Sequence, residues 1–366
     1  MSRKLASIQI IKDIQPIEGK DRIMLARIEG WHVIVGKDDF KIGDKCVYIE
    51  IDSVLDPNNP VFDQARKRSN RVRTMKLGGI YSEGIAYPIS ILPNMVNDHT
   101  VSYEQYHEGD DVTDLLHIVK YDEYGDSEKI PSVSIKKPKY NKLQLFWYKL
   151  FGFPEKICKN EFPSLISKTD EERIQNIPEA LNYKEPVVVS EKVDGCSLSA
   201  VLERVGTIFP HEKFTLASRN YSLGKDNSHY WRAAERYDLQ EKMSLMLEET
   251  GGRWIAIQGE VAGPGIQKNP YKLTEIDFYI FNIIDETGRW GTEKMMNFCY
   301  RYGLQTVPII DLNYILPDTV EGMLQYATNK SLIEPTVLRE GVVIRSKDGQ
   351  KSFKAVSPEY LVKHNK

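Results

Sequence analysis

Apolar and polar positions alternate over short runs in the first 120 residues of the chain, and turn-forming residues separate these runs. Such alternation is typical of β-strands that bury one face. Gly, Pro, Asn and Asp between the runs favour turns. The pattern predicts strands at residues 5–17, 23–36, 44–55 and 83–92. Regular short strands of this kind indicate a small barrel or a sandwich.

A different kind of segment follows. Residues 121–160 are largely polar and are interrupted by Pro131 and Pro138. Prolines in a polar stretch stop regular structure and favour an extended connection. We therefore expect a linker over 121–160.

From residue 161 onward, helical and strand patterns are mixed. A helix is expected to begin at Thr169, because Glu172 follows three residues later as in a capping box. A second helical run over 228–250 stops at Gly251 and Gly252. Strands are predicted at residues 187–193, 197–205, 214–220, 253–262, 276–284, 340–346 and 351–357.

The bulk composition is that of an ordinary globular protein, with 366 residues, 41% hydrophobic and 28% charged. A chain of this length is expected to hold two domains. No apolar run approaches the ~18 residues of a membrane span. The first residues lack the apolar core of a signal peptide. We therefore expect an intracellular, cytoplasmic protein without membrane contact.

The cysteines and histidines show no metal-site spacing. The four cysteines are far apart and form no C-x-x-C pair, and the seven histidines form no H-E-x-x-H motif. These spacings argue against a zinc ribbon and against a disulfide framework.

One stretch of the first 120 residues is strongly basic, although the formal net charge of the chain is −3. Clustered Lys and Arg in an otherwise acidic protein indicate a phosphate-backbone footprint. The alternative is a solvated loop without a partner. The candidate nucleic-acid contacts, called here the basic run, are Arg66, Lys67, Arg68, Arg71, Arg73 and Lys76.

The run EKVDG at 191–195 places Lys192 at the end of a β-branched strand. Taken alone, this lysine fits an exposed strand-end charge. As a nucleophile it would need a neutral amine, because only the free amine attacks. Desolvation or nearby cations lower the pKa of a lysine in the required direction. Further charged residues follow at the ends of predicted strands, namely Arg219, Glu260, Glu340, Arg345 and Lys354.

This ordered series resembles the covalent nucleotidyltransferase superfamily of polynucleotide ligases and mRNA capping enzymes. The motifs are EKVDGCS (191–197), SRN (218–220), QGE (258–260), DFYIFNI (277–283), EGVVIR (340–345) and SFKAVS (352–357). The resemblance implies that Lys192 is the catalytic residue, which attacks the α-phosphate of ATP and carries AMP covalently. It also implies a divalent cation, Mg²⁺ or Mn²⁺. Cations around Lys192 are expected to favour its free amine.

The remaining roles also come from the resemblance, motif by motif. It implies that Asp194, Glu260 and Glu340 hold the metal ion. The implied nucleotide contacts are Glu191 beside adenine, Phe281 stacked on adenine, Arg219 and Glu260 at the ribose, Lys354 at the α-phosphate, and Arg173 as a phosphate contact. Many ligases carry two lysines in the last motif, whereas only Lys354 stands here, and Lys351 lies at a different spacing.

Residues 6–55 resemble the N-terminal OB domain of Deinococcus-type RNA ligases. The implied fold class is α+β, with an N-terminal OB-type β-barrel followed by an adenylyltransferase (ATP-grasp-like ligase) domain of antiparallel sheets and flanking helices. No C-terminal OB domain is expected, because only residues 358–366 follow the last motif. The expected domains are 1–120, which binds nucleic acid, and 161–366, the nucleotidyltransferase, joined by the linker.

The resulting prediction is a monomeric ATP-dependent RNA ligase. It forms lysyl-AMP at Lys192, transfers AMP to a 5′-phosphate and seals nicks with an RNA 3′-OH in duplexes, as in RNA repair. The expected partner is RNA or an RNA-containing nicked duplex. Two alternatives remain open: another enzyme of the superfamily, such as a DNA ligase or a GTP-dependent guanylyltransferase, or a non-enzymatic RNA-binding protein.

Overall fold

The computed structural model describes residues 4–92, 95–96, 99–100, 102–121, 161–207, 209–347, 349 and 351–365. The predicted linker therefore lies almost entirely outside the described residues. The N-terminal barrel is built on an antiparallel sheet in the order β3-β2-β1-β4-β8. Its strands are β1 (Ala6–Ile17), β2 (Lys20–Ile28), β3 (Trp31–Gly36), β4 (Lys45–Ile49) and β8 (Ile85–Pro88).

The length of β1 explains how this sheet curves. Ala6–Ile10 pair with β4, whereas the second half of the strand pairs with β2 across an irregularity that begins at Ile11. One strand thus belongs to two parts of a strongly bent sheet, as in small barrels. The inward side chains form a single core around Ile8, Trp31 and Phe62. This architecture confirms the predicted OB-type barrel.

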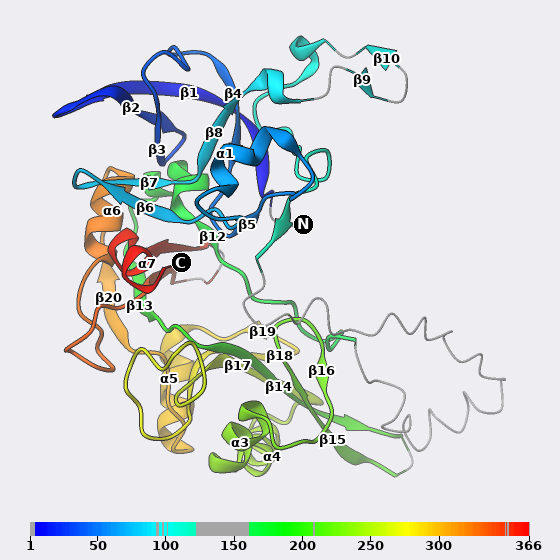
Figure 1. Ribbon diagram of the computed structural model, residues 1–366. Helices are drawn as coiled ribbons and strands as arrows, with labels where there is room; N and C mark the ends of the chain where they lie inside the picture. Colours follow the sequence, from blue (N-terminus) through cyan, green and yellow to red (C-terminus); the bar gives the residue numbers. More distant parts are fainter. Residues whose placement is uncertain are drawn as a thin grey trace.

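Short elements complete the barrel. They are β5 (Ser53–Val54) paired with β11 (Val119–Lys120), α1 (Asp63–Arg66), the hairpin β6 (Thr74–Leu77) and β7 (Ile80–Glu83), and the pair β9 (Met95–Val96) and β10 (His99–Thr100). Figure 1 shows these blue and cyan elements above β14–β19 (residues 196–289) and their helices.

The described residues from 161 onward, called here the two-sheet region, contain two sheets. The five-stranded sheet has the order β12-β22-β21-β13-β20. Its strands are β12 (Glu172–Arg173), β13 (Val187–Lys192), β20 (Ile309–Tyr314), β21 (Gly341–Ser346) and β22 (Ser352–Val356). The six-stranded sheet has the order β16-β15-β14-β17-β18-β19. Its strands are β14 (Cys196–Val205), β15 (His211–Ala217), β16 (Ser222–Leu223), β17 (Trp254–Ala262), β18 (Asp277–Asp285) and β19 (Gly288–Arg289).

Helices cover one face of each sheet. Apolar side chains of α3 (His229–Arg236), α4 (Leu239–Thr250) and α5 (Thr292–Arg301) share a core with the six-stranded sheet. Those of α6 (Val320–Ala327) pack on the five-stranded sheet. The helical run predicted over 228–250 is divided at Asp238, whose φ is +46°, and it ends at Gly251 with φ +67°. A left-handed residue breaks helical hydrogen bonding, and glycine adopts that conformation without a steric penalty.

The prediction of a helix beginning at Thr169 is wrong. Glu172 and Arg173 form β12, which pairs in parallel with Phe353 and Lys354, and 3₁₀ turns follow at Ile174–Asn176 and Pro178–Asn182. Arg173 is only 5% exposed. Tertiary pairing and burial outweigh the capping signal here, because local propensity is a weak prior.

The same segment joins the two-sheet region to the N-terminal barrel. The Gly30 N–H donates to the Gln175 carbonyl (3.0 Å), and Trp31 Nε1 donates to Asn176 Oδ1 (2.6 Å). Asn176 also donates to Glu50 (2.9 Å). A side chain at position 30 would meet the Gln175 backbone at 2.7 Å, so only glycine fits there. The interface is therefore closely packed and polar.

The last helix, α7 (Pro358–His364), lies below β6 on the left of Figure 1. Its Leu361 belongs to the core of the barrel. None of the described helices is long and apolar enough to cross a membrane.

A buried carboxylate at this interface gives a pH-dependent prediction. Burial raises the pKa of Glu83 from its ordinary value of 4.5 to about 7, although Arg173 and the Gln175 amide oppose the increase. The folded state therefore keeps a proton that the unfolded state releases between these two values, and the free energy of unfolding contributed by Glu83 falls as pH rises through that window. Over this window the free energy of unfolding should fall by up to about 3 kcal/mol because of Glu83, and Glu83→Gln should abolish that fall.

The measurement is urea unfolding of the wild type and the variant between pH 4.5 and pH 7. The free energy of unfolding of Glu83→Gln, relative to that of the wild type, should increase steadily as pH rises. The exposed Glu18, on the turn between β1 and β2, provides the matched control Glu18→Gln. Parallel stability profiles for wild type and Glu83→Gln would contradict the assignment.

Candidate active site

Lys192 is the last residue of β13, where the chain crosses from the five-stranded sheet to β14 of the six-stranded sheet. It lies opposite Gly341 in the β13–β21 ladder, so Glu340 falls beside it. The Lys192 Nζ lies 2.6 Å from Glu340 Oε2. A side chain at position 195 would meet the Val261 carbonyl oxygen at 2.3 Å. The glycine of the K-x-D-G run is therefore required for the close approach of the start of β14 to β17.

The charges around Lys192 differ from the expectation. Burial alone lowers its pKa, but Glu340, Glu260 and Asp194 outweigh that effect and raise the pKa above its ordinary value. The expected cations do not dominate in this conformation, because Glu340 lies 2.6 Å from the amine and Glu260 and Asp194 act in the same direction. Burial also raises the pKa of Glu260 to about 8, with Lys192 acting in the opposite direction. The prediction of a lowered lysine pKa is wrong for the free protein.

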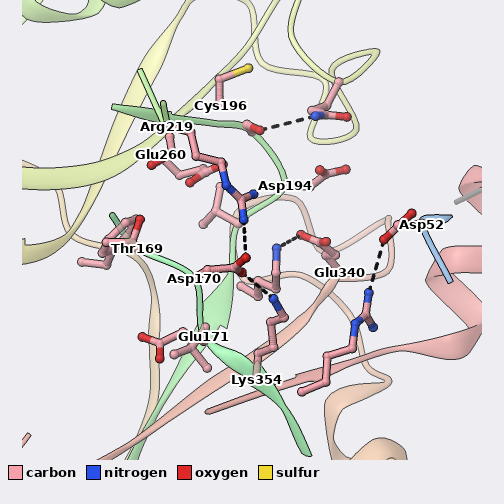
Figure 2. A pocket seen from close by; sticks show the side chains of 18 of the residues that line it. Asp52, Thr169, Asp170, Glu171, Asp194, Cys196, Arg219, Glu260, Glu340 and Lys354 are labelled. Atoms are coloured by element: carbon pink, nitrogen blue, oxygen red, sulfur yellow. Dashed lines mark hydrogen bonds and ion pairs between the residues drawn. The ribbon is translucent and has the colours of Figure 1, made fainter. Parts of the chain in front are cut away.

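The cationic side chains instead pair with Asp170, a carboxylate that we did not select from the sequence. Asp170 accepts from Arg219 Nη2 at 2.5 Å and from Lys354 Nζ at 2.9 Å, as Figure 2 shows. Lys120 Nζ lies 3.9 Å away. Burial acts to raise the pKa of Asp170, but Lys354 and Arg219 hold it well below its ordinary value. The sequence signal was its place in the segment 167–176, which we interpreted as a helix start.

Side chains from both parts of the protein meet on another wall of the site. Arg71 Nη2 lies 2.6 Å from Asp52 Oδ1, and Arg173 Nη2 lies 3.7 Å from Asp52 Oδ2. The Arg173 atoms Nε and Nη1 are buried and have no hydrogen-bond partner among the described residues. Buried donors of this kind indicate a missing acceptor.

The aromatic side chains of strand β18 lie on its two faces, as the alternation along the strand predicts. Phe278 packs in the core under the helices, whereas Tyr279 and Phe281 belong to a separate cluster that also contains Val307. Arg345 Nη1 donates to the Phe281 carbonyl (2.6 Å). Phe281 is thereby held at the rim of an apolar patch within the site.

Glu191 is almost fully buried, at 1% exposed. Its Oε1 accepts from the Ser331 hydroxyl (2.6 Å), and its Oε2 accepts from the Leu332 N–H (2.7 Å). Burial raises its pKa, against these hydrogen bonds. Each oxygen retains one further lone-pair position. Neither Ser331 nor Leu332 carried a recognisable sequence signal.

All the candidate catalytic, nucleotide and metal residues line one cavity of about 990 Å³. The predicted residues that line it are Arg173, Glu191, Lys192, Asp194, Arg219, Glu260, Phe281, Glu340 and Lys354. The structure adds Asp52, Lys120, Asp170, Glu171 and Arg345 to this set. Residues separated by more than 300 positions are thus brought together, and the N-terminal barrel supplies one wall.

The candidate metal ligands share the cavity without forming a closed cage. In the described part of the chain, no group of three or more His, Cys, Asp or Glu side chains is arranged to hold a metal ion. Carboxylates are nevertheless the donors that Mg²⁺ and Mn²⁺ prefer, and Mg²⁺ commonly uses one or two carboxylates together with substrate phosphates. The donor set fits a cation that is completed by phosphate oxygens.

The basic run does not act as one unit. Arg71 lines the cavity. Its guanidinium carbon lies over the Tyr121 ring, 3.8 Å from the ring centroid. Arg66 pairs with Asp63, and Arg73 donates to Asn365. The exposed members are Lys67, Arg68 and Lys76.

Comparisons with known proteins agree with this geometry. A model of the RNA ligase family matches residues 185–356, and a model described as an OB-fold domain matches residues 5–89. A comparison with curated protein sequences finds no match.

Solved structures match over the whole length. The Naegleria gruberi RNA ligase with pyrophosphate is 30% identical, with a TM-score of 0.77, and the match covers 100% of this chain and 99% of that one. A mutant of the same enzyme with ATP and Mn gives a TM-score of 0.79 at 30% identity, covering 100% of both chains. Another mutant, with AMP and Mn, gives 0.76 at 30% identity, covering 99% of each. The chain therefore belongs to the RNA ligase family.

Proposed function

We propose that this RNA ligase uses ATP and a divalent cation, and that it forms lysyl-AMP at Lys192. The observation that carries the proposal is the cavity in which Lys192 lies at a strand crossing, bonded to Glu340 and sharing the lining with Asp194, Glu260, Arg219 and Lys354. The binding of ATP, AMP and Mn by the Naegleria enzyme supports the choice of nucleotide and metal.

The proposed chemistry has three steps. The neutral Nζ of Lys192 attacks the α-phosphorus of ATP, a P–N bond forms, the bond to the β-phosphate breaks, and diphosphate leaves. An oxygen of an RNA 5′-phosphate then attacks the same phosphorus, which transfers AMP to the RNA and frees the lysine. Finally a 3′-OH attacks the activated 5′-phosphate, a phosphodiester forms, and AMP leaves.

Within the first step, this chain's own residues have distinct tasks. Lys354 and Arg219 neutralise phosphate charge that builds up during attack. They must leave Asp170 to do so, and the incoming phosphates replace that carboxylate. Arg173, with two buried donors that lack partners among the described residues, is a further phosphate contact. Glu340 lies at hydrogen-bond distance from Nζ, so its carboxylate is placed to accept the proton that Lys192 loses when the amine becomes neutral.

A bound divalent cation would supply positive charge to the phosphates. Asp194, Glu260 and Glu340 would hold it, directly or through water. On the adenine side, Phe281 offers a ring for stacking, and Glu191 offers its remaining acceptor positions.

The test is incubation with ATP labelled at the α-phosphate, with Mg²⁺ or Mn²⁺, followed by denaturing electrophoresis. Label that survives denaturation on the wild-type protein is expected. Label from GTP instead would indicate a guanylyltransferase. Absence of label after any bound AMP has been stripped would overturn the proposal.

The substrate assignment is a nicked duplex with RNA on the 3′-OH side. It rests on the N-terminal barrel, which supplies Asp52 and Arg71 to the cavity and carries the exposed part of the basic run. We also propose that the chain belongs to the Deinococcus-type ligases within this family. We further propose that it consists of the domains 1–120 and 161–366 and that the enzyme is a monomer.

Charge reversal of the exposed basic residues tests the RNA assignment. The double variant Lys67→Glu/Arg68→Glu should weaken binding of a nicked duplex. The steepness of the plot of log affinity against log salt concentration should also fall by about 2, since each phosphate contact contributes nearly one unit to that slope. Sealing should fall with binding, whereas protein labelling by ATP should stay at the wild-type level. We omit Arg71 because it lines the cavity.

The matched control is Lys37→Glu/Lys41→Glu, which reverses two exposed lysines of the same barrel after β3. Its binding should remain closer to that of the wild type. An equal loss of binding in both double variants would show that the effect is one of net charge rather than of this site.

A further inference from the structure

Tyr360 of α7 contacts the active site from outside the predicted motifs. Its side chain is completely buried, and its hydroxyl donates to Asp194 Oδ2 at 2.7 Å. Asp194 is itself 5% exposed and lines the cavity. The Asp194 N–H donates to the Tyr271 hydroxyl, also at 2.7 Å. The backbone and the carboxylate of Asp194 are therefore both fixed by tyrosines.

The beginning of α7 is fixed to another predicted metal ligand. The Ser357 N–H donates to the Glu340 carbonyl (2.8 Å), and the Ser357 hydroxyl caps the helix by accepting from the Tyr360 N–H (3.2 Å). Thr328 at the end of α6 donates to the same hydroxyl oxygen (2.9 Å). One short segment thus bonds to Asp194 through a side chain and to Glu340 through the backbone.

The other side of α7 contacts the N-terminal barrel. Leu361 packs in the barrel core and also lines the cavity. Asn365, directly after the helix, accepts from Arg73 of the basic run. The Tyr360 ring stacks on His364, with centroids 4.0 Å apart and an interplanar angle of 20°. The position of the tyrosine is therefore set by contacts on several sides.

We propose that Tyr360 is a positioning residue, which orients the Asp194 carboxylate so that Oδ1 stays directed to the cation and the phosphates. This inference rests on the proposed function. A carboxylate that keeps one oxygen in a hydrogen bond loses rotational freedom, and its other oxygen is presented in a defined direction. Groups that orient a metal ligand typically contribute 10- to 100-fold to metal affinity or activity.

The test uses Tyr360→Phe, which removes the hydroxyl and keeps the ring. We expect Mn²⁺ to bind about 10-fold more weakly to the protein loaded with α,β-methylene-ATP, as measured by the electron paramagnetic resonance signal of free Mn²⁺. The Mn²⁺ concentration that gives half-maximal lysyl-AMP formation should rise by the same factor. Tyr237→Phe is the matched control, because Tyr237 bonds to Asp277 at 3.0 Å outside the cavity.

A double-mutant cycle with Asp194→Asn separates positioning from general stability. In the Asp194→Asn background, Tyr360→Phe should cause no further loss of Mn²⁺ affinity. Equal losses in both backgrounds, or unchanged Mn²⁺ binding in Tyr360→Phe, would overturn the inference while the labelling of Lys192 by ATP stood. Failure of the wild type to label would overturn the proposed function, whatever the manganese data showed.

Discussion

Lys192→Ala is expected to abolish lysyl-AMP formation, with a loss of more than about 1000-fold in labelling by α-labelled ATP. The covalent step needs an amine at this position, and none of the other described residues that line the cavity offers one at the strand crossing. Lys354 is the nearest alternative in function, but it is bonded to Asp170. Lys184→Ala is the control, since Lys184 lies just before β13, is exposed and pairs with Asp318.

The same variant tests the order of the steps. A nicked duplex that already carries AMP on its 5′-phosphate bypasses the two steps that use the lysine. Lys192→Ala should therefore still seal this substrate at a measurable rate, while it fails on an ordinary nick. A labelled Lys192→Ala protein would reassign the nucleophile. Equal failure on both substrates would indicate that the lysine acts structurally.

The strand pattern and the motifs were sufficient to predict the fold class and the candidate catalytic, nucleotide and metal residues that line the cavity. The alternation in β1–β4 and the distinct faces of Phe278 and Phe281 follow from the period of two residues along a strand. Motif order then placed Lys192, Glu260 and Glu340 at strand ends, where the structure brings them together.

The electrostatics of the site could not be obtained in this way. Glu340 is 148 positions from Lys192 in the chain, yet the two groups lie 2.6 Å apart. The sign of the pKa shift depends on that distance and on burial, and neither is visible in sequence order. Asp170 was missed for a related reason: its segment was interpreted from a local capping signal, whereas its role follows from tertiary contact with Arg219 and Lys354.

The basic run shows the same limit. Clustering in sequence suggested one surface, but Arg71 extends into the cavity and Arg73 contacts the residue after α7. Charge density predicts the presence of an anion site, whereas side-chain direction decides which anion each residue meets.

Lys354→Met is expected to reduce lysyl-AMP formation by about 100-fold, because removal of one preorganised charge from a developing oxyanion typically costs 10²–10³ in rate. The substitution keeps most of the side-chain volume. Burial lowers the pKa of Lys354 to about 8, although Asp170 opposes that change, so the free protein loses this charge above that pH. Lys354→Arg should keep the charge and should extend phosphate binding to higher pH.

Lys351→Met is the matched control for this prediction. Lys351 belongs to the same motif segment, yet its Nζ lies over the Tyr183 ring, 4.5 Å from the centroid, and it does not line the cavity. The variant should label with ATP within about threefold of the wild-type rate, since surface substitutions usually have small effects. A large loss in Lys351→Met, with near-normal labelling of Lys354→Met, would show that Lys351 supplies the phosphate contact. Comparable losses in both variants would instead indicate that two lysines act on the triphosphate, because charge at both positions would then be needed for the same step.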